Sequence, residues 1–309
     1  MKIFKPKFWD KKYSIIGFFL LPLSIFLQIL IALKNKISNQ KKFSIPVICV
    51  GNIYVGGTGK TPLSLEIFKI LESLNKKVAI IKKSYTQHDD EFKLIESKGA
   101  KLFKNSSRSL AINDAIKNKF ECVILDDGFQ DFSITKNLNI ICFNEKQLAG
   151  NGMTLPSGPL REYFSALKKC QIVVINGDTN LNFEKKIKDI STDISIHYSE
   201  YSPTNIENFK GKNLLAFAGI GNPDNFFDLL EKNKFKLTKK IAFPDHYNYT
   251  LKELNDLISL SIEMNSQIIT TEKDFYRIKH FQLSQIQCLN IAVKMVNKKK
   301  FENEINKYL

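Results

Sequence analysis

A glycine-rich segment, Tyr54–Thr61, carries the clearest chemistry in the sequence and reads YVGGTGKT. Backbone N–H groups in such a loop, together with the dipole of a helix that follows it, bind phosphate groups. Lys60 would then contact the β- and γ-phosphates of a nucleotide, and the hydroxyl of Thr61 would bind Mg²⁺. Tyr54 replaces the first glycine of the general pattern, so the glycine pair that follows has to supply the flexibility. The candidate nucleotide-binding residues are Tyr54, Val55, Gly56, Gly57, Thr58, Gly59, Lys60 and Thr61.

A pair of aspartates ends another strongly apolar run, Phe120–Asp127, which reads FECVILDD. Asp126 stands at the end of the predicted strand, where the Mg²⁺-facing carboxylate of a nucleotide site belongs, and Asp127 follows it. Paired aspartates at a strand end also occur in an ordinary turn that caps a helix, and the residues alone leave that alternative open. The candidate metal-binding residues are Thr61, Asp126 and Asp127.

The elements around these residues are those of an α/β fold. A short β-branched run, Ser44–Asn52, is typical of a fully buried strand and leads straight into the glycine-rich segment. Apolar residues at helical spacing follow that segment. Further short strands are predicted at Val78–Ile81, Ile140–Phe143 and Gln171–Ile175, with helical stretches between them. This alternation predicts a mostly parallel sheet of the P-loop NTPase kind.

A second, smaller α/β unit is predicted from about residue 211. The segment NLLAFAGIGNP reads as a strand that enters a helix at Pro223. A helix over Leu251–Met264 precedes a strand QIITTEKD, and CLNIAVKM is predicted as one further strand. The polar stretch Tyr198–Lys212 is the best candidate for a linker. The sequence thus predicts an N-terminal segment 1–42, a nucleotide-binding domain 43–200 and a C-terminal domain 211–309.

The N-terminal segment contains 21 residues without a formal charge, Tyr13–Leu33, with lysines on both sides. As a helix it would be about 31 Å long, close to the thickness of the hydrocarbon core of a bilayer. Trp9 lies where an interfacial aromatic residue belongs. Because Pro22, Ser24 and Gln28 dilute the apolar character and the lysines give no charge difference between the ends, we expect a helix that lies in or dips into the cytoplasmic leaflet. A helix buried in the protein core is the alternative.

The composition is that of a folded globular protein with a basic surface. The chain has 309 residues, of which 43% are hydrophobic and 25% charged, and its net charge is +15, which excludes the disordered, collagen-like and disulfide-scaffold classes. Three of its 46 basic residues are arginine, whereas nucleic-acid readers usually exploit the planar arginine fork. We therefore expect no nucleic-acid partner, and lysines on a solvated face or against anionic lipid or phosphate. Five scattered cysteines without a CxxC pair indicate neither a zinc ribbon nor a disulfide framework.

Seven segments, in order, resemble the tetraacyldisaccharide 4′-kinase family, the lipid A 4′-kinases of the Gram-negative inner membrane. They are the N-terminal apolar helix, PVICVGNIYVGGTGKTP, ILDDGFQ, GNGMTLPSGPLRE, FAGIGNPDNFF, FPDHYNY and ITTEKD. The resemblance covers nearly the whole chain and includes the loss of the first loop glycine at Tyr54. It implies transfer of the γ-phosphoryl group of ATP, with Mg²⁺, to the 4′-hydroxyl of a disaccharide 1-phosphate that carries four acyl chains. It also implies a monomer at the cytoplasmic face of the inner membrane, bound to membrane lipids through its N-terminal helix.

The resemblance further implies the roles of individual residues. In the family, a carboxylate pairs with the histidine of a Phe-Pro-Asp-His motif to deprotonate the sugar hydroxyl, and the matching residues here are Asp90, with Glu91 beside it, and His246. Lys60 and Arg161, with the metal-facing carboxylate, would neutralise the transferred phosphoryl group. Without the motifs, His246 reads as a loop histidine and Arg161 as a partner in a surface ion pair. The candidate catalytic residues are Asp90, His246, Lys60, Arg161 and Glu91.

The loop Lys83–Glu91 departs from the family pattern. The family has a Ser-Arg-Gly-Tyr-Gly segment and a longer glycine-rich stretch there, whereas this chain has KSYTQHDDE. The alignment therefore leaves Asp89 open as an alternative base to Asp90. The contact that the arginine makes in the family is either lost or supplied by Lys83. His88 is either a solvated loop histidine or a residue that enters the site.

Three other classes of protein share parts of the pattern. A membrane-associated partitioning-type ATPase also has a GGTGKT-like loop, but it places a lysine where this chain has Val55, and it docks through a C-terminal helix. A GTP-binding switch protein needs an Asn-Lys-x-Asp motif, and the nearest segment, Asn118–Glu121, ends in the wrong residue. A non-catalytic membrane adaptor has little use for Lys60, Thr61 and Asp126 together. The kinase is therefore the favoured prediction, with the ATPase as its alternative.

Overall fold

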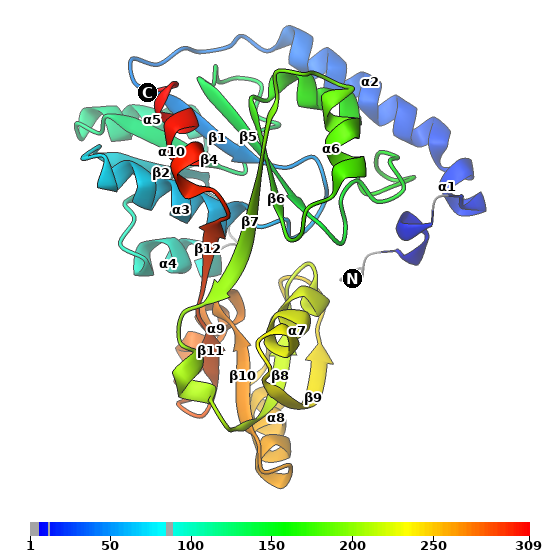
Figure 1. Ribbon diagram of the computed structural model, residues 1–309, viewed down its shortest axis with the longest axis vertical. Coiled ribbons are helices and arrows are strands. Elements are labelled where there is room, and N and C mark those ends of the chain that lie inside the picture. Colours follow the sequence, from blue (N-terminus) through cyan, green and yellow to red (C-terminus); the bar gives the residue numbers. More distant parts are fainter. Residues whose placement is uncertain (1–5, 12, 85–88) are drawn as a thin grey trace. The chain divides into compact units, whose positions relative to one another are not determined.

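The computed structural model describes residues 6–11, 13–84 and 89–309, and these form two compact units (Figure 1). The larger unit contains the described residues up to 84, together with 99–200 and 293–309. The smaller unit contains residues 89–98 and 201–292. Each unit is built around its own sheet of mostly parallel strands, so the predicted α/β class holds for both.

The larger unit is built on an eight-stranded sheet in the order β12-β7-β6-β5-β1-β4-β2-β3. From β3 across to β7 every strand pair is parallel. Strands with both faces covered read as continuous apolar runs, which is why β1 and β4 are buried along their whole length. The strands are β1 (Val47–Gly51), β2 (Val78–Lys83), β3 (Leu102–Asn105), β4 (Cys122–Asp126), β5 (Leu138–Asn144), β6 (Ile172–Asn176), β7 (Ser195–Pro203) and β12 (Ile291–Met295).

Helices pack on this sheet through one apolar face each. Ile112 and Ala115 of α5 and Phe183 and Ile187 of α6 are buried in the same apolar core as the strands. Residues spaced three or four apart lie on one helix face, so each helix covers the sheet with that face. The helical elements are α3 (Lys60–Ser73), α5 (Arg108–Lys117), η2 (Phe164–Lys169), α6 (Leu181–Lys188) and α10 (Lys298–Asn306).

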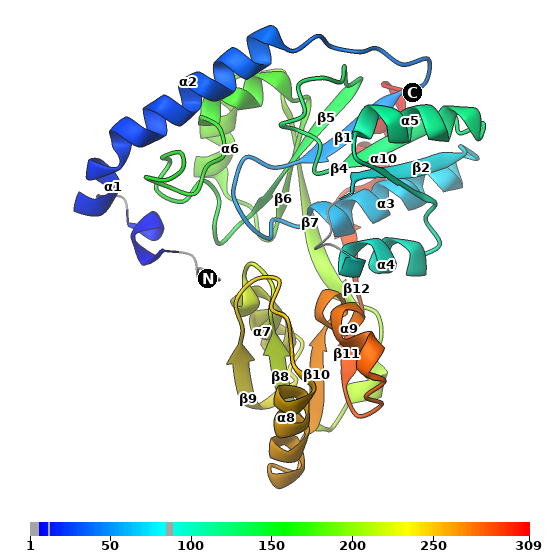
Figure 2. The ribbon, with the colours of Figure 1, turned by 180° about the vertical axis from the view of Figure 1, so that it is seen from behind.

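The N-terminal part forms three short helical elements instead of the single helix that was predicted. They are η1 (Lys7–Asp10), α1 (Ile15–Phe19) and α2 (Leu21–Ile37). The break falls at Leu20, just before Pro22, because a proline has no N–H to continue the helical hydrogen bonds and is favoured in a first turn. Among the described residues, no helix is long and apolar enough to cross a membrane. In Figure 2, α2 lies at the outside of the larger unit, and an extended segment leads from its end to β1.

The smaller unit has a four-stranded parallel sheet in the order β11-β10-β8-β9. Alternate residues of the central strand β8 face opposite sides of this sheet: Leu214, Ala216 and Ala218 pack with α7, whereas Leu215 and Phe217 pack with α8. The elements are β8 (Asn213–Ala218), β9 (Lys236–Ala242), β10 (Gln267–Thr271), β11 (Gln287–Leu289), η3 (Ile206–Phe209), α7 (Pro223–Lys232), α8 (Leu251–Glu263), α9 (Glu272–Ile278), η4 (Lys279–Phe281) and α4 (Asp89–Ser97).

Three predicted elements of the C-terminal half differ from the structure. The expected linker Tyr198–Lys212 is mostly strand β7 and the 3₁₀ helix η3. The strand in the segment QIITTEKD ends at Thr271. The hydroxyl of Thr271 accepts a hydrogen bond from the backbone N–H of Asp274 and so caps helix α9. The segment CLNIAVKM divides at Asn290 into β11 and β12, which belong to different sheets.

The division into units also differs from the predicted domains 43–200 and 211–309. Helix α4, from the first half of the sequence, packs against α9 of the smaller unit. Conversely, residues 293–309 belong to the larger unit, where Phe301 and Ile305 of α10 are buried. Both exchanges involve contacts between residues more than 90 positions apart, which local sequence patterns do not specify.

Candidate functional site

The glycine-rich loop joins the end of β1 to the start of α3, as predicted. Gly59 adopts a φ of 92° immediately before the first helical residue, Lys60, and Gly56 adopts a φ of 110°. These left-handed conformations are strained for residues with a Cβ atom. An added Cβ at Gly56 or Gly57 would meet no atom within 4 Å. The loop therefore borders open space, as a phosphate-binding loop must.

The buried side-chain amide of Asn52 holds this loop at Tyr54, the position at which the general pattern has its first glycine. The Nδ2 of Asn52 donates hydrogen bonds to the carbonyl oxygen of Tyr54 at 2.5 Å and to the Oγ1 of Thr58 at 2.9 Å. The Tyr54 side chain is buried in the core, and the N–H of Val55 donates to Pro159. Tyr54 and Val55, both predicted to bind nucleotide, are therefore engaged with the protein, which leaves the glycines and the start of α3 to face a ligand.

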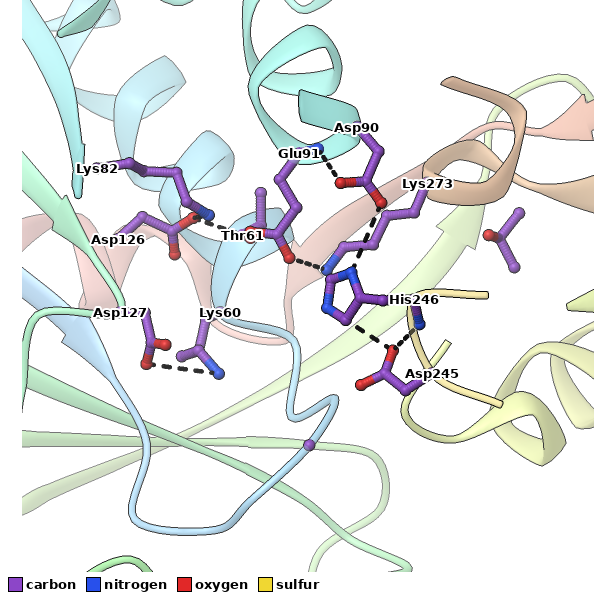
Figure 3. Close-up of polar contacts among 12 residues, drawn as sticks. Lys60, Thr61, Lys82, Asp90, Glu91, Asp126, Asp127, Asp245, His246 and Lys273 are labelled. Carbon is purple, nitrogen blue, oxygen red and sulfur yellow. Dashed lines mark hydrogen bonds and ion pairs between the residues drawn. The ribbon is translucent and has the colours of Figure 1, made fainter. Parts of the chain in front are cut away.

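Asp126 lies beside the loop because of the strand register. Strand β4 pairs with β1 so that Asp126 stands opposite Val50. Its carboxylate accepts hydrogen bonds from Thr61 at 2.9 Å and Ser64 at 3.2 Å, and it forms a 2.7 Å ion pair with Lys82 (Figure 3). Lys82 was not singled out from the sequence, although a lysine in the apolar run of β2 requires a buried partner.

Asp127 contacts a different set of cations. Its carboxylate lies 3.6 Å from the Nζ of Lys60 and 3.1 Å from Nη1 of Arg161. Burial raises the pKa of Asp127, but Lys60, Arg161 and more distant cations outweigh burial and lower it to about 2. The backbone of Asp127 has a φ of 61°, and its carbonyl accepts from Arg108. Two positive side chains are thus held beside the loop. We call Lys60, Thr61, Asp126, Asp127 and Arg161 the nucleotide cluster.

The loop that carries Arg161 also supports the N-terminal helix α2. The hydroxyl oxygen of Ser24 lies within hydrogen-bonding distance of the carbonyl oxygen of Thr154, at 3.0 Å, and of the hydroxyl of Ser157, at 2.8 Å. One turn along, the side chain of Gln28 donates to the backbone carbonyl of Arg161 at 3.1 Å. The polar residues that dilute the apolar helix therefore face the protein. They fix α2 to the segment that supplies a cation to the nucleotide cluster.

The residues of the nucleotide cluster fit a Mg²⁺ ion bound together with a nucleotide. Mg²⁺ in such sites takes one or two carboxylates, a hydroxyl and phosphate oxygens. Thr61 and Asp126 supply a hydroxyl and a carboxylate that already lie within 2.9 Å of each other. The described residues contain no group of three or more His, Cys, Asp or Glu side chains that could hold a metal, and a site of this kind needs none.

A second group of charged residues surrounds Asp90 at the start of α4, in the smaller unit. Asp90 is buried, and its Oδ1 accepts from the N–H of Glu91 at 2.9 Å. Its Oδ2 accepts from Nη2 of Arg277 at 2.5 Å. The same oxygen lies 3.9 Å from Nδ1 of His246 (Figure 3). The predicted pairing of Asp90 with His246 is therefore present in the geometry, although Arg277 is the nearer partner.

His246 lies on the loop that follows β9. It has a φ of 52°, its N–H donates to the carbonyl of Gly219 at 3.1 Å, and its Nε2 lies 3.9 Å from Asp245 (Figure 3). A non-glycine residue with positive φ persists where surrounding contacts hold it, and such residues are common at functional sites. The half-buried imidazole thus lies between two carboxylates.

Helix α9 contributes partners that the sequence interpretation missed. Lys273 forms a 2.5 Å ion pair with Glu91, and Glu272 pairs with Lys98 at the other end of α4. Together with Arg277, these residues hold α4 through three ion pairs. The available signal was the run of charges that follows the strand in ITTEKDFYR. We call Asp90, Glu91, His246, Lys273 and Arg277 the base cluster.

The nucleotide cluster and the base cluster together contain all of the predicted catalytic and metal-binding residues. Asp89, the alternative to Asp90 as the base, belongs to neither. Residues 85–88 of the shortened loop, including His88, lie outside the described residues. Asp89 begins α4, and its side chain is not among those described. Lys83 ends β2. The geometry therefore describes contacts for Asp90 but offers no comparison with Asp89.

Comparison with known sequences decides the family. The family model described as tetraacyldisaccharide-1-P 4′-kinase matches residues 16–309. The chain belongs to this family. The tetraacyldisaccharide 4′-kinase of Pelagibacter ubique is 42% identical over 313 residues, which cover 99% of this chain and 98% of that protein. The tetraacyldisaccharide 4′-kinase of Rickettsia felis is 33% identical, over 96% of this chain and 95% of that protein.

A solved structure has the same fold. The crystal structure of LpxK from Aquifex aeolicus in complex with ATP matches with a TM-score of 0.73 and 23% identity, and covers 95% of this chain and 99% of that one. The family predicted from the seven segments and the predicted α/β fold are both confirmed. The partitioning-type ATPase, kept as the alternative, is not favoured.

Proposed function

We propose that this protein transfers the γ-phosphoryl group of ATP to the 4′-hydroxyl of a tetraacyldisaccharide 1-phosphate, a step of lipid A biosynthesis. The observation that carries this proposal is the nucleotide cluster, in which Thr61, Asp126, Lys60 and Arg161 are assembled beside an open glycine-rich loop. Membership of a family whose relatives are named as this kinase supports the choice of acceptor.

The nucleotide cluster supplies most of the catalysis in this proposal. Phosphoryl transfer depends mainly on positioning and on neutralising the charge of the transferred group. Lys60 and Arg161 are directed at that charge, and both contact Asp127. Thr61 and Asp126 would hold Mg²⁺, which neutralises charge on the phosphates. The loop N–H groups and the N-terminus of α3 would bind the phosphates.

The base cluster activates the acceptor. In the proposed step, a bond forms between the 4′-oxygen and the γ-phosphorus, and the bond from that phosphorus to the β,γ-bridging oxygen of ATP breaks. The hydroxyl proton passes to the carboxylate of Asp90, and ADP leaves with the electron pair of the broken bond. His246, 3.9 Å from Asp90, orients the carboxylate and stabilises its charge. Glu91 remains paired with Lys273 and holds the start of α4.

The N-terminal helices provide a surface for an acceptor that stays in the membrane. Polar Ser24 and Gln28 face the protein, whereas large apolar side chains along α1 and α2 are exposed, including Phe18 at 69% and Phe19 at 77% of their surface. Contiguous apolar patches on a monomer mark interaction surfaces. We infer that α1 and α2 lie in the cytoplasmic leaflet of the inner membrane, with the protein acting as a monomer.

The function is tested by phosphoryl transfer from γ-labelled ATP, with Mg²⁺, to the tetraacyldisaccharide 1-phosphate in detergent micelles. The unaltered protein and Lys60→Ala are assayed in parallel. A labelled lipid made only by the unaltered protein is the expected result. ATP hydrolysis without lipid labelling would instead favour the ATPase, and would overturn the proposed acceptor.

The membrane surface is tested by flotation with anionic lipid vesicles. Removing a phenyl ring from the bilayer costs about 1.5–3 kcal/mol, so Phe18→Ser and Phe19→Ser are each expected to lower the partition coefficient about tenfold or more. Leu181→Ser is the matched control, because Leu181 is exposed to a similar extent but lies on α6. Equal effects at all three positions would contradict the assignment of α1 to the bilayer.

A further inference from the structure

A fully buried carboxylate lies next to the base cluster without belonging to it. Asp274 of α9 accepts hydrogen bonds from the N–H of Gly219 at 2.9 Å, the hydroxyl of Thr271 at 2.8 Å and the hydroxyl of Tyr249 at 3.1 Å. It also forms a 2.7 Å ion pair with Arg277. Every one of these partners is a hydrogen-bond donor. A buried carboxylate that accepts this many hydrogen bonds is held rigidly in place.

Two chains of hydrogen bonds lead from Asp274 to the two candidate catalytic residues, Asp90 and His246. Arg277, held by Asp274, donates from its other nitrogen to Asp90 at 2.5 Å. The carbonyl of Gly219 accepts from Arg277 at 3.0 Å and also from the N–H of His246 at 3.1 Å. Asp274 therefore contacts neither Asp90 nor His246, yet a single hydrogen-bonded step separates it from each.

The space at Gly219 shows how closely these groups are packed. A Cβ atom at this position would lie 2.6 Å from the Tyr249 hydroxyl and 3.1 Å from Asp274. Only glycine leaves room for that hydroxyl to reach Asp274. Gly219, Tyr249 and Asp274 come from FAGIGNP, FPDHYNY and ITTEKD, three segments in which the sequence interpretation named only His246 as a site residue.

Contacts other than that of Arg277 also anchor α4. The helix is anchored by the pairs Glu91–Lys273 and Lys98–Glu272 and by the buried side chains of Phe92, Leu94 and Ile95. The contact of Arg277 instead fixes Oδ2 of Asp90, while the Glu91 N–H fixes Oδ1. Both oxygens are thus constrained, and the plane of the carboxylate is set relative to the His246 ring.

We propose that Asp274 and Arg277 are positioning residues that set the geometry of Asp90 and His246 from one buried point. The inference rests on the proposed kinase function, because it concerns the base of that reaction. Neither residue exchanges a proton with the substrate. Their effect is to hold the base within reach of the acceptor hydroxyl, where a misplacement of about 1 Å can cost on the order of 100-fold in rate.

The test is a kinetic comparison of Asp274→Asn with the unaltered protein. The amide is isosteric, but it turns a donor toward partners that are all donors and removes the counter-charge of Arg277. We expect kcat for lipid phosphorylation to fall about 10- to 100-fold, with KM for ATP unchanged because the nucleotide cluster belongs to the other unit. Glu253→Gln is the matched control, since Glu253 also accepts from a tyrosine, Tyr247, and from Thr250 but lies outside the network.

A double variant separates positioning from general stabilisation. If Asp274 acts through Asp90, the variant Asp90→Asn/Asp274→Asn will be as slow as Asp90→Asn alone. If the two substitutions lower kcat by factors that multiply in the double variant, or if Asp274→Asn leaves kcat unchanged, the inference is overturned. Either result would leave the kinase function intact. If Asp274→Asn does not fold, Arg277→Lys serves in its place, with a smaller fall in kcat than Arg277→Gln expected. No labelled lipid from the unaltered protein would overturn the proposed function, and this inference with it.

Discussion

The nucleotide cluster and the base cluster are assembled from the chain in opposite ways. The first is largely local, because Lys60 and Thr61 follow β1 directly and Asp126 ends the neighbouring strand. The second joins Asp90 to residues more than 150 positions away, on the loop after β9 and on α9. The glycine-rich loop and the strand end thus come from neighbouring segments, whereas Asp90, the proposed base, is held by an ion pair between helices far apart in the chain.

The difference also shows in what neutralises each carboxylate. Asp126 and Asp127 form ion pairs with three cations, two of which, Lys60 and Arg161, are the groups expected to turn to the phosphates of ATP. Asp90 is held by Arg277, which is itself tied to a second carboxylate, Asp274. Two cations of the nucleotide cluster are therefore directed at a ligand, whereas the cation that pairs with Asp90 is held by a second carboxylate of the protein. We therefore expect ATP to change the side-chain contacts of the nucleotide cluster but not those of the base cluster.

Among substitutions around the nucleotide cluster, removing the loop lysine is expected to have the largest effect. Lys60→Ala takes away a cation directed at the transferred phosphoryl group, and loss of one such group typically costs about 100- to 1,000-fold in kcat. Nucleotide affinity should fall as well, since Lys60 also contacts the phosphates of the ground state. Steady-state phosphorylation and direct nucleotide binding measure the two effects. Retention of both would contradict the assignment of the loop.

A smaller effect is expected from the amide that holds the loop. Asn52→Asp removes the donor to the carbonyl of Tyr54, and a buried acceptor left unsatisfied costs about 1–3 kcal/mol. We expect KM for ATP to rise roughly tenfold, with kcat less affected. Asn137→Asp is the matched control, because the Oδ1 of Asn137 accepts from Val47 and a carboxylate preserves that bond. An equal rise in both variants would show that the loop geometry is not responsible.

The smallest effect concerns acid stability. The pKa of Asp127 is lowered to about 2 in the folded protein, below its ordinary value of 3.8, so the folded state binds this proton less tightly than the unfolded state. Its contribution to stability is therefore fully present above about pH 4 and is lost as the pH falls through about 2. Denaturant unfolding of Asp127→Asn and the unaltered protein should give stabilities that converge toward pH 2. A gap that does not depend on pH would contradict this account.

The sequence predicted the local features and missed the long-range ones. The β1–loop–α3 unit, Asp126 at a strand end and the apolar helix are read from short-range patterns of glycine, aspartate and hydrophobic residues. The break at Leu20, the division at Asn290 and the exchange of α4 between units were not predicted. The division at Asn290 and the exchange of α4 depend on packing between segments far apart in the chain, whereas the break at Leu20 comes from the nearby Pro22. Lys82 and Arg277 were missed because their partners are assigned only once the sheets and helices are assembled.

The most direct test of the account measures ATP binding and lipid phosphorylation together in Asp90→Asn and Lys60→Ala. Loss of a general base typically costs about 100- to 10,000-fold in rate. The account predicts that Asp90→Asn binds ATP like the unaltered protein and has lost most of its kcat, whereas Lys60→Ala is impaired in both. Normal turnover by Asp90→Asn would contradict it and would turn attention to Asp89.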